Sequence, residues 1–167
     1  MKKICSITMI AVFFLLFTNG IEAQTTQTQL NQVELLKQFL GSWKSEVGKD
    51  TTCFADFKPV GTVMEGNRNF VTNGKTFQSF KELIGYDKKT DKFIASQLWI
   101  SSPDMHLYAL YFTAKNICEV ILFQDISNPE KAALKWKYEF KSSDLAIATY
   151  IENNKVVSVD TYNRVKK

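Results

Sequence analysis

Arg68 is the side chain of this sequence whose chemistry points most directly to ligand binding. In an extended strand it shares a face with Met64, Gly66 and Phe70, because side chains alternate between the two faces of a strand. If that face points into the protein, the guanidinium group could hold a carboxylate or phosphate through two parallel hydrogen bonds. The alternative is that Arg68 pairs with an internal acidic residue such as Glu82, because a buried charge needs a partner.

Aromatic side chains form the second group with the chemistry of a binding site. Trp136 and Tyr138 share one face of the segment 132–141, whose other face carries lysines and a glutamate. Trp99 and Tyr111 are further candidates, although both faces of their strands carry apolar residues. The ligand-binding residues predicted from the sequence are Arg68, Phe70, Trp99, Tyr111, Trp136 and Tyr138. The alternative is that these rings simply fill a core.

Catalytic and metal-binding patterns are weak in this chain. It has no Gly-x-Ser-x-Gly sequence and no glycine-rich phosphate loop, and its single histidine, His106, has no serine or cysteine beside it. A lone histidine without paired cysteines predicts neither a metal site nor a cofactor. Carboxylates such as Glu65 and Glu82 could still meet in space, so an enzyme is not excluded, but a non-enzymatic protein is the favoured interpretation.

The elements that must position these residues are short strands. Runs of period-two alternation recur at the spacing typical of all-β folds, separated by turn sequences such as Asn73-Gly74 and Asn153-Asn154. After a first strand around Trp43, the predicted strands cover residues 52–57, 61–72, 75–86, 93–101, 105–114, 117–124, 132–141, 145–152 and 155–165. A chain of hairpins has exposed edges unless it closes. We therefore predict an all-β fold, an antiparallel up-and-down barrel of about 8–10 strands.

A short helix precedes the first strand. Apolar residues recur at helical spacing between Asn31 and Leu40. Asn31 is a suitable N-cap, Glu34 lies three residues later as in a capping box, and Gly41 can adopt the left-handed turn that ends a helix.

Several motifs resemble those of known barrel families. The helix followed by Gly41-Ser42-Trp43 resembles the Gly-x-Trp signature of the lipocalins, which are calycin-type barrels. The resemblance implies that Arg164, near the end of the last strand, packs over Trp43 and closes the barrel. This contact is a cation–π interaction.

A second resemblance covers residues 36–101. The stretch Gly66-Asn67-Arg68-Asn69-Phe70, then Ile84-Gly85-Tyr86-Asp87, then Trp99, resembles a family of bacterial secreted lipocalin-like proteins of unknown function. Asn67 stands where that family has a second glycine. Because the family has no assigned chemistry, the resemblance implies a fold rather than a function.

The N-terminus predicts export. Lys2 and Lys3 precede an apolar run over residues 7–17, and Ala23 suits cleavage before Gln24. We therefore expect a signal peptide over 1–23, a disordered leader over 24–30 and the barrel domain over 31–167. The alternative is an uncleaved N-terminal anchor. The destination, periplasmic or secreted, is left open.

Charge and cysteines limit the partners. The formal charge of +4 is scattered along the chain, which does not indicate nucleic-acid binding. No second long apolar run follows residue 17, so no stable membrane insertion is expected once the signal is removed. Export would permit a disulfide between Cys53 and Cys118, but both lie in apolar strand patterns typical of buried free cysteines.

These observations predict an exported lipocalin-like protein that binds a small hydrophobic or amphipathic ligand inside the barrel, with Arg68 at the polar head. The alternative is a surface-interaction or structural envelope protein whose barrel is filled. A cavity below roughly 300 Å³ would favour the alternative, since typical ligand sites are larger.

Overall fold

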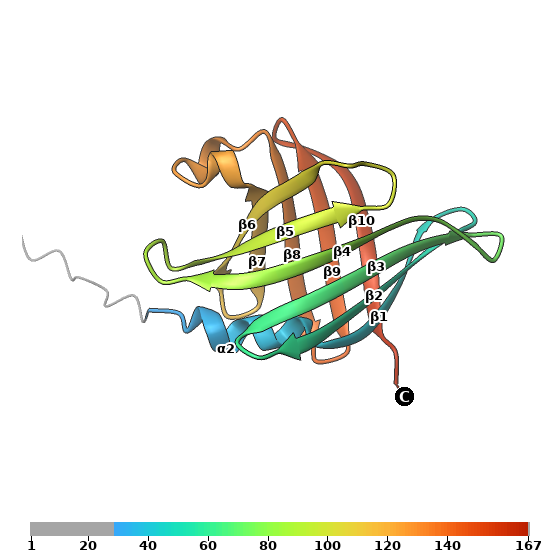
Figure 1. Ribbon diagram of the computed structural model, residues 1–167, viewed down its shortest axis with the longest axis horizontal. Coiled ribbons are helices and arrows are strands. Elements are labelled where there is room, and N and C mark those ends of the chain that lie inside the picture. Colours follow the sequence, from blue (N-terminus) through green and yellow to red (C-terminus); the bar gives the residue numbers. More distant parts are fainter. Residues whose placement is uncertain (1–28, 167) are drawn as a thin grey trace, which may run out of the picture.

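The computed structural model describes residues 29–166. The predicted signal peptide and most of the predicted leader lie outside the described residues. Within them, ten strands form one sheet, each antiparallel to its neighbours in the chain, and β10 pairs back to β1 (Figure 1). The predicted fold class, an antiparallel up-and-down barrel with a short N-terminal helix, is confirmed.

The strands follow the predicted order with small changes of boundary. They are β1 (Gly41–Gly48), β2 (Thr51–Val60), β3 (Val63–Thr72), β4 (Lys75–Asp87), β5 (Lys92–Trp99), β6 (Met105–Ala114), β7 (Ile117–Leu122), β8 (Leu134–Ser142), β9 (Leu145–Glu152) and β10 (Lys155–Arg164). Two hairpins use the expected residues at positive φ: Asn73 and Gly74 at 50° and 74°, and Asn153 and Asn154 at 49° and 62°. Both pairs suit the tight turns whose twist matches that of the strands.

The segment between β7 and β8 differs most from the prediction. Strand β7 ends at Leu122 rather than Gln124, and two 3₁₀ turns follow, η2 (Phe123–Asp125) and η3 (Pro129–Lys131). Ala132 then packs with Ala109 and Ile121 in a small apolar cluster separate from the main core. This segment therefore covers part of the barrel's outer face.

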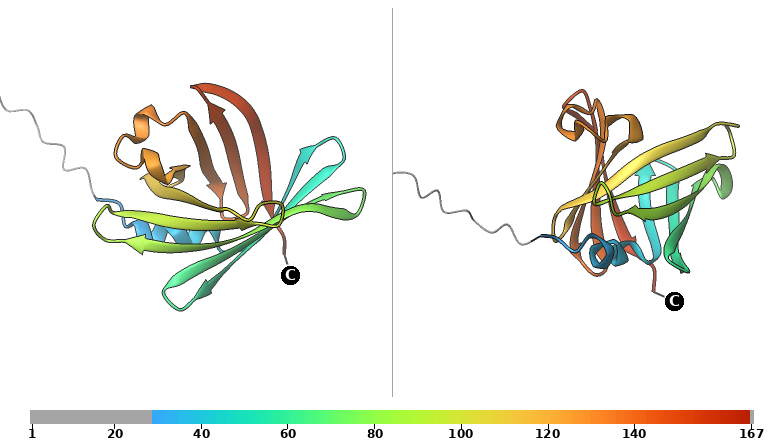
Figure 2. Two further views of the ribbon diagram at one scale, coloured as in Figure 1. Left: turned by 45° about the horizontal axis from the view of Figure 1, so that its top comes forward. Right: turned by 60° about the vertical axis from the view of Figure 1, so that its left-hand side comes forward.

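One end of the barrel is covered by the helix α2 (Gln32–Leu36) and the 3₁₀ turn η1 (Lys37–Phe39). The side chain of Asn31 accepts a hydrogen bond from the backbone N–H of Glu34, as predicted. Leu36 and Phe39 are buried in the main core. The right-hand view of Figure 2 shows the helix at the lower end of the barrel.

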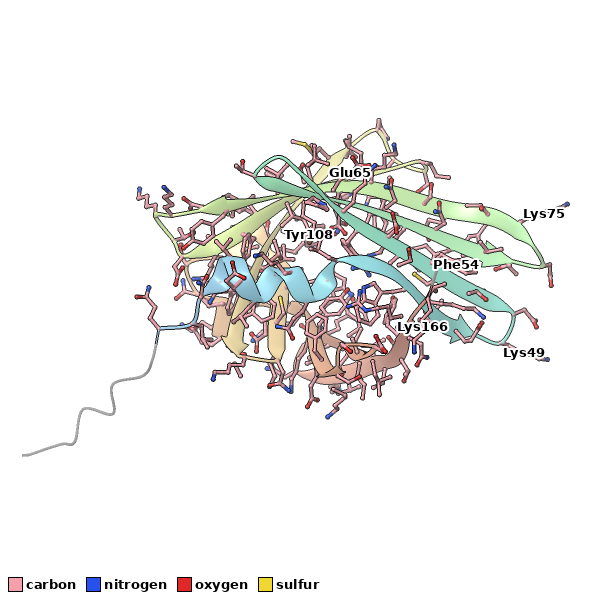
Figure 3. The ribbon with its side chains drawn as sticks, turned by 90° about the horizontal axis from the view of Figure 1, so that it is seen from below. Lys49, Phe54, Glu65, Lys75, Tyr108 and Lys166 are labelled. Carbon is pink, nitrogen blue, oxygen red and sulfur yellow. The ribbon has the colours of Figure 1, made fainter. Side chains whose placement is uncertain are left out.

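Gln32 fastens this helix to the barrel wall. Its amide group donates to the carbonyl oxygen of Phe112 at 3.0 Å and accepts from the Phe112 N–H at 2.7 Å, and its side chain is buried. Figure 3, seen from below, shows the helix lying across the barrel end, with Lys49 and Lys75 at the projecting hairpins.

Barrel closure combines Trp43 with Arg164, which face each other where β1 meets β10. The Arg164 guanidinium carbon lies 4.1 Å from the centre of the Trp43 ring. Arg164 also donates to the carbonyl oxygens of Leu40, Gln38 and Ser143. Gly41 has a φ of +101°, and a Cβ there would lie 2.5 Å from Arg164 Nη1, so both the turn and the arginine require glycine.

None of the helices described within residues 29–166 has the length and apolar character needed to cross a membrane.

Candidate ligand-binding cavity

A cavity of about 220 Å³ lies inside the barrel. Five of the six predicted ligand-binding residues line it: Arg68, Phe70, Trp99, Trp136 and Tyr138. They come from β3, β5 and β8, and strand alternation turns all of them inward. The structure therefore brings together residues that are far apart in the sequence.

Arg68 lies among aromatic rings on the cavity wall. Its guanidinium carbon is 5.5 Å from the ring centre of Phe57, 5.6 Å from that of Phe80 and 5.6 Å from that of Tyr138. Only 12% of the Arg68 side chain is exposed. Cation–π contacts and the burial of the aliphatic stem hold the side chain in this position.

Glu82 is the charged partner of Arg68. Its side chain is 4% exposed, and Oε1 lies 3.7 Å from Arg68 Nε. Gln97 donates from Nε2 to Glu82 Oε2 at 2.9 Å. Arg68 Nε and Glu82 Oε1, however, have no hydrogen-bond partner. The pair is thus compensated in charge, while one donor and one acceptor are left unpaired.

Gly66 makes room for this polar group. It pairs with Glu82 across β3 and β4, and a Cβ at position 66 would lie 2.7 Å from both Glu82 Cγ and Phe57 Cε1. Only glycine lets the Glu82 side chain lie flat against β3. This observation accounts for a glycine that the sequence alone marked only through a resemblance.

Aromatic rings line the rest of the cavity. Phe80 and Trp99 lie with ring centres 4.2 Å apart, and Trp136 lies 5.7 Å from Tyr108 and 5.1 Å from Tyr150. These surfaces are suited to a flat or apolar molecule. Burial raises the pKa of Tyr108, Tyr138 and Tyr162 above the ordinary 10.0, so their hydroxyl groups stay protonated to higher pH than those of exposed tyrosines.

Asp160 and Ser158 add polar groups from β10. Burial raises the pKa of the Asp160 carboxyl group. Sequence reasoning missed both residues, because the neighbouring side chains of Val156, Val157 and Val159 are the apolar ones and yet are exposed on the outer surface. The one available signal was Tyr162, a buried ring on the same face of β10.

Glu82 and Gln97 were also absent from the predicted site, as were Tyr108 and Tyr150. The register of the barrel places these residues beside other residues of the cavity wall. Gln97 pairs with Glu82, and Tyr150 pairs with Trp136. The sequence named Glu82 as a possible partner of Arg68 and as a carboxylate that could meet Glu65, and the structure shows the pairing with Arg68.

Tyr111 lies outside the cavity, on the opposite face of β6 from Tyr108, Leu110 and Phe112. Its hydroxyl group donates to Glu119 Oε2 at 2.9 Å, and Lys92 Nζ lies 5.1 Å from its ring centre. Tyr111 packs against the small outer cluster of Ala109, Ile121 and Ala132. The β7–β8 segment covers this outer face, which is why both faces of β6 carry apolar residues.

Other candidate groups do not meet. Glu65 faces outward and lies 3.3 Å from Lys58, whereas Glu82 faces inward, so the carboxylate pair left open by the sequence does not form. Cys53 and Cys118 are free and buried. Within residues 29–166, no group of three or more His, Cys, Asp or Glu side chains is placed to hold a metal ion.

Comparison with known proteins adds no identification: no protein-family model and no curated protein matches the chain.

Proposed function

We propose that this chain is an exported lipocalin-like protein that binds a small amphipathic molecule inside its barrel. The observation that carries the proposal is a cavity lined by aromatic rings together with the polar side chains of Arg68, Glu82 and Gln97.

The volume limits the size of the ligand. At about 220 Å³, the cavity is smaller than the roughly 300 Å³ typical of ligand sites. A compact molecule, such as one ring with a short polar substituent, suits this space better than a long acyl chain. Lipids with long acyl chains are therefore not the proposed ligands.

In this proposal Arg68 does not bind an anionic ligand by itself. Glu82 already compensates its charge, so the two residues together with Gln97 form a polar floor that offers both donors and acceptors. Phe70, Trp99, Trp136 and Tyr138 supply apolar contacts. Trp43 and Arg164 close the far end and take no part in binding.

Native mass spectrometry of the purified protein tests this proposal. Spectra would be recorded before and after incubation with a panel of single-ring alcohols, amines, amides and carboxylic acids. We expect one-to-one complexes with members of the panel, and loss of these complexes when Trp136 is replaced by Ala. A protein that is empty on isolation and takes up no member of the panel would contradict the proposal.

A second candidate function is interaction through the outer surface. Large apolar side chains are exposed on neighbouring strands β4, β5 and β6, including Leu83, Leu98 and Met105, and Leu98 pairs directly with Met105. The small cavity volume also favours this alternative. It would prevail if the cavity took up none of the panel while Leu98→Ser abolished binding to a partner.

A further inference from the structure

The charged residues that line the cavity carry an excess of negative charge. Twenty residues line it, and three of them carry formal charges: Arg68, Glu82 and Asp160. Arg68 is compensated by Glu82. Asp160 makes no ion pair with any residue between 29 and 166. The cavity is thus acidic by one formal charge in a chain whose total formal charge is +4.

The net negative charge of the lining residues opposes the binding of an anionic ligand. A carboxylate or phosphate entering the cavity would add to the two carboxylates already there, and Arg68 is already paired. Like charges at short range in a poorly solvated site raise the free energy of the complex. A positively charged group would instead give Asp160 a partner.

The aromatic rings that line the cavity favour a cationic ligand. The ring centre of Trp136 lies 5.7 Å from that of Tyr108 and 5.1 Å from that of Tyr150. Trp99 and Phe80 form a further pair of close rings. Ring faces attract cations, most strongly those of tryptophan, when the cation is shielded from water. Tyr150 and Asp160 come from the adjacent strands β9 and β10, so rings and a carboxylate are presented to the same space.

From this juxtaposition we infer that the cavity selects a small organic cation, an amine attached to a single ring or short apolar body. The ammonium group lies against Asp160 and the neighbouring rings, and the apolar body lies among Trp99, Phe80 and Phe70. Glu82 and Gln97, which also line the cavity, offer polar contacts to a substituent of the body. The inference rests on the proposed function, because it assigns a ligand class to the same cavity.

Isothermal titration calorimetry with three probes of nearly equal size tests the inference. Phenethylamine, phenethyl alcohol and phenylacetate share one ring and differ in charge. We expect the amine to bind the intact protein at least tenfold more tightly than the alcohol, and phenylacetate to bind most weakly. Equal or tighter binding of the alcohol or phenylacetate would overturn the inference and leave the proposed function standing.

A matched pair of variants locates the effect. Asp160→Asn should weaken amine binding by about tenfold and change alcohol binding by less than about twofold, because only the amine uses the charge. Asp104→Asn removes the same charge from the exposed turn between β5 and β6 and should leave amine binding unchanged. An equal loss with both variants, or none with Asp160→Asn, would overturn the inference.

Failure of all three probes also has a defined meaning. If none binds and mass spectrometry finds a different cavity ligand, the assignment to small cations is wrong and the proposed function survives. If none binds and the wider panel is not taken up either, both are wrong.

Discussion

At the scale of single residues, the buried pair of Arg68 and Glu82 dominates the interior. Two charges that are 12% and 4% exposed are tolerable only together, because an unpaired ion in this environment is poorly solvated. The sequence left two roles open for Arg68, holding a ligand anion or pairing with Glu82. The structure shows the ion pair with Glu82 and places both side chains on the wall of the cavity.

Replacing Arg68 by Met should destabilise the fold, because it leaves Glu82 buried without a counter-charge. We expect the free energy of unfolding to fall by about 3 kcal/mol, and most of this loss to be recovered in the double variant Arg68→Met with Glu82→Gln. Urea denaturation of the wild type, the two single variants and the double variant completes the cycle. Simple additivity of the two single losses would show that the pair does not interact.

Replacing Arg164 by Ala should cost stability without changing ligand binding. The change removes the cation–π contact with Trp43 and leaves the carbonyl oxygens of Gln38, Leu40 and Ser143 without their donor. We expect a loss of about 3 kcal/mol in the free energy of unfolding. Lys166→Ala removes an exposed neighbouring cation and is the control. A similar stability for both variants would refute the closing role of Arg164.

At the scale of elements, the orientation of a side chain could be predicted from the sequence only where the two faces of its strand differ in polarity. In β8, Trp136 and Tyr138 alternate with lysines, and their inward orientation was predictable. In β10 the contrast is reversed, because Ser158 and Asp160 face the cavity while three valines face outward. A polar residue inside a barrel is recognisable only once its neighbours in the register are known. The strand order was predictable because hairpin turns leave little choice of topology.

Tyr111 shows a second limit at this scale. Both faces of β6 are apolar, one because it lines the interior and the other because the β7–β8 segment packs over it. Alternation alone could not decide between them, since no helix or strand was predicted for residues 125–131, between the strands at 117–124 and 132–141.

The attachment of helix α2 can be tested at Gln32. Gln32→Ala should leave the buried N–H and carbonyl groups of Phe112 without partners, which we expect to cost about 2 kcal/mol of unfolding free energy. The neighbouring Gln38→Ala is the control, because Gln38 makes its backbone contacts at a more exposed position. Equal losses for both, measured by thermal unfolding, would argue against a specific attachment through Gln32.

At the scale of the whole molecule, many buried groups are neutral acids. Burial raises the pKa of the thiols of Cys53 and Cys118 above the ordinary 9.0 and that of the phenols of Tyr138 and Tyr162 above the ordinary 10.0. In the unfolded chain these groups lose their protons first as pH rises. The unfolded state then binds fewer protons than the folded state, so stability decreases with pH.

The melting temperature should therefore be nearly constant between pH 7 and about pH 8.5 and fall steadily at higher pH, where the unfolded thiols and phenols ionise. Tyr162→Phe keeps the ring and removes one ionisable group, so it should make the fall less steep. Differential scanning calorimetry across this range provides the measurement. A melting temperature that rises between pH 9 and pH 10.5 would contradict the burial of these groups.

The central claim is that the barrel interior is the binding site. The three tryptophans of the sequence provide its most direct test. Trp99 and Trp136 line the cavity, whereas Trp43 is 3% exposed at the closed end and donates its indole N–H to the carbonyl oxygen of Phe39. Nuclear magnetic resonance of ¹⁵N-labelled protein would follow the indole N–H signals during titration with phenethylamine. We predict saturable shifts of the Trp99 and Trp136 signals and little change at Trp43. Shifts confined to backbone amides on the outer face, such as those of Leu98 and Met105, would contradict the claim.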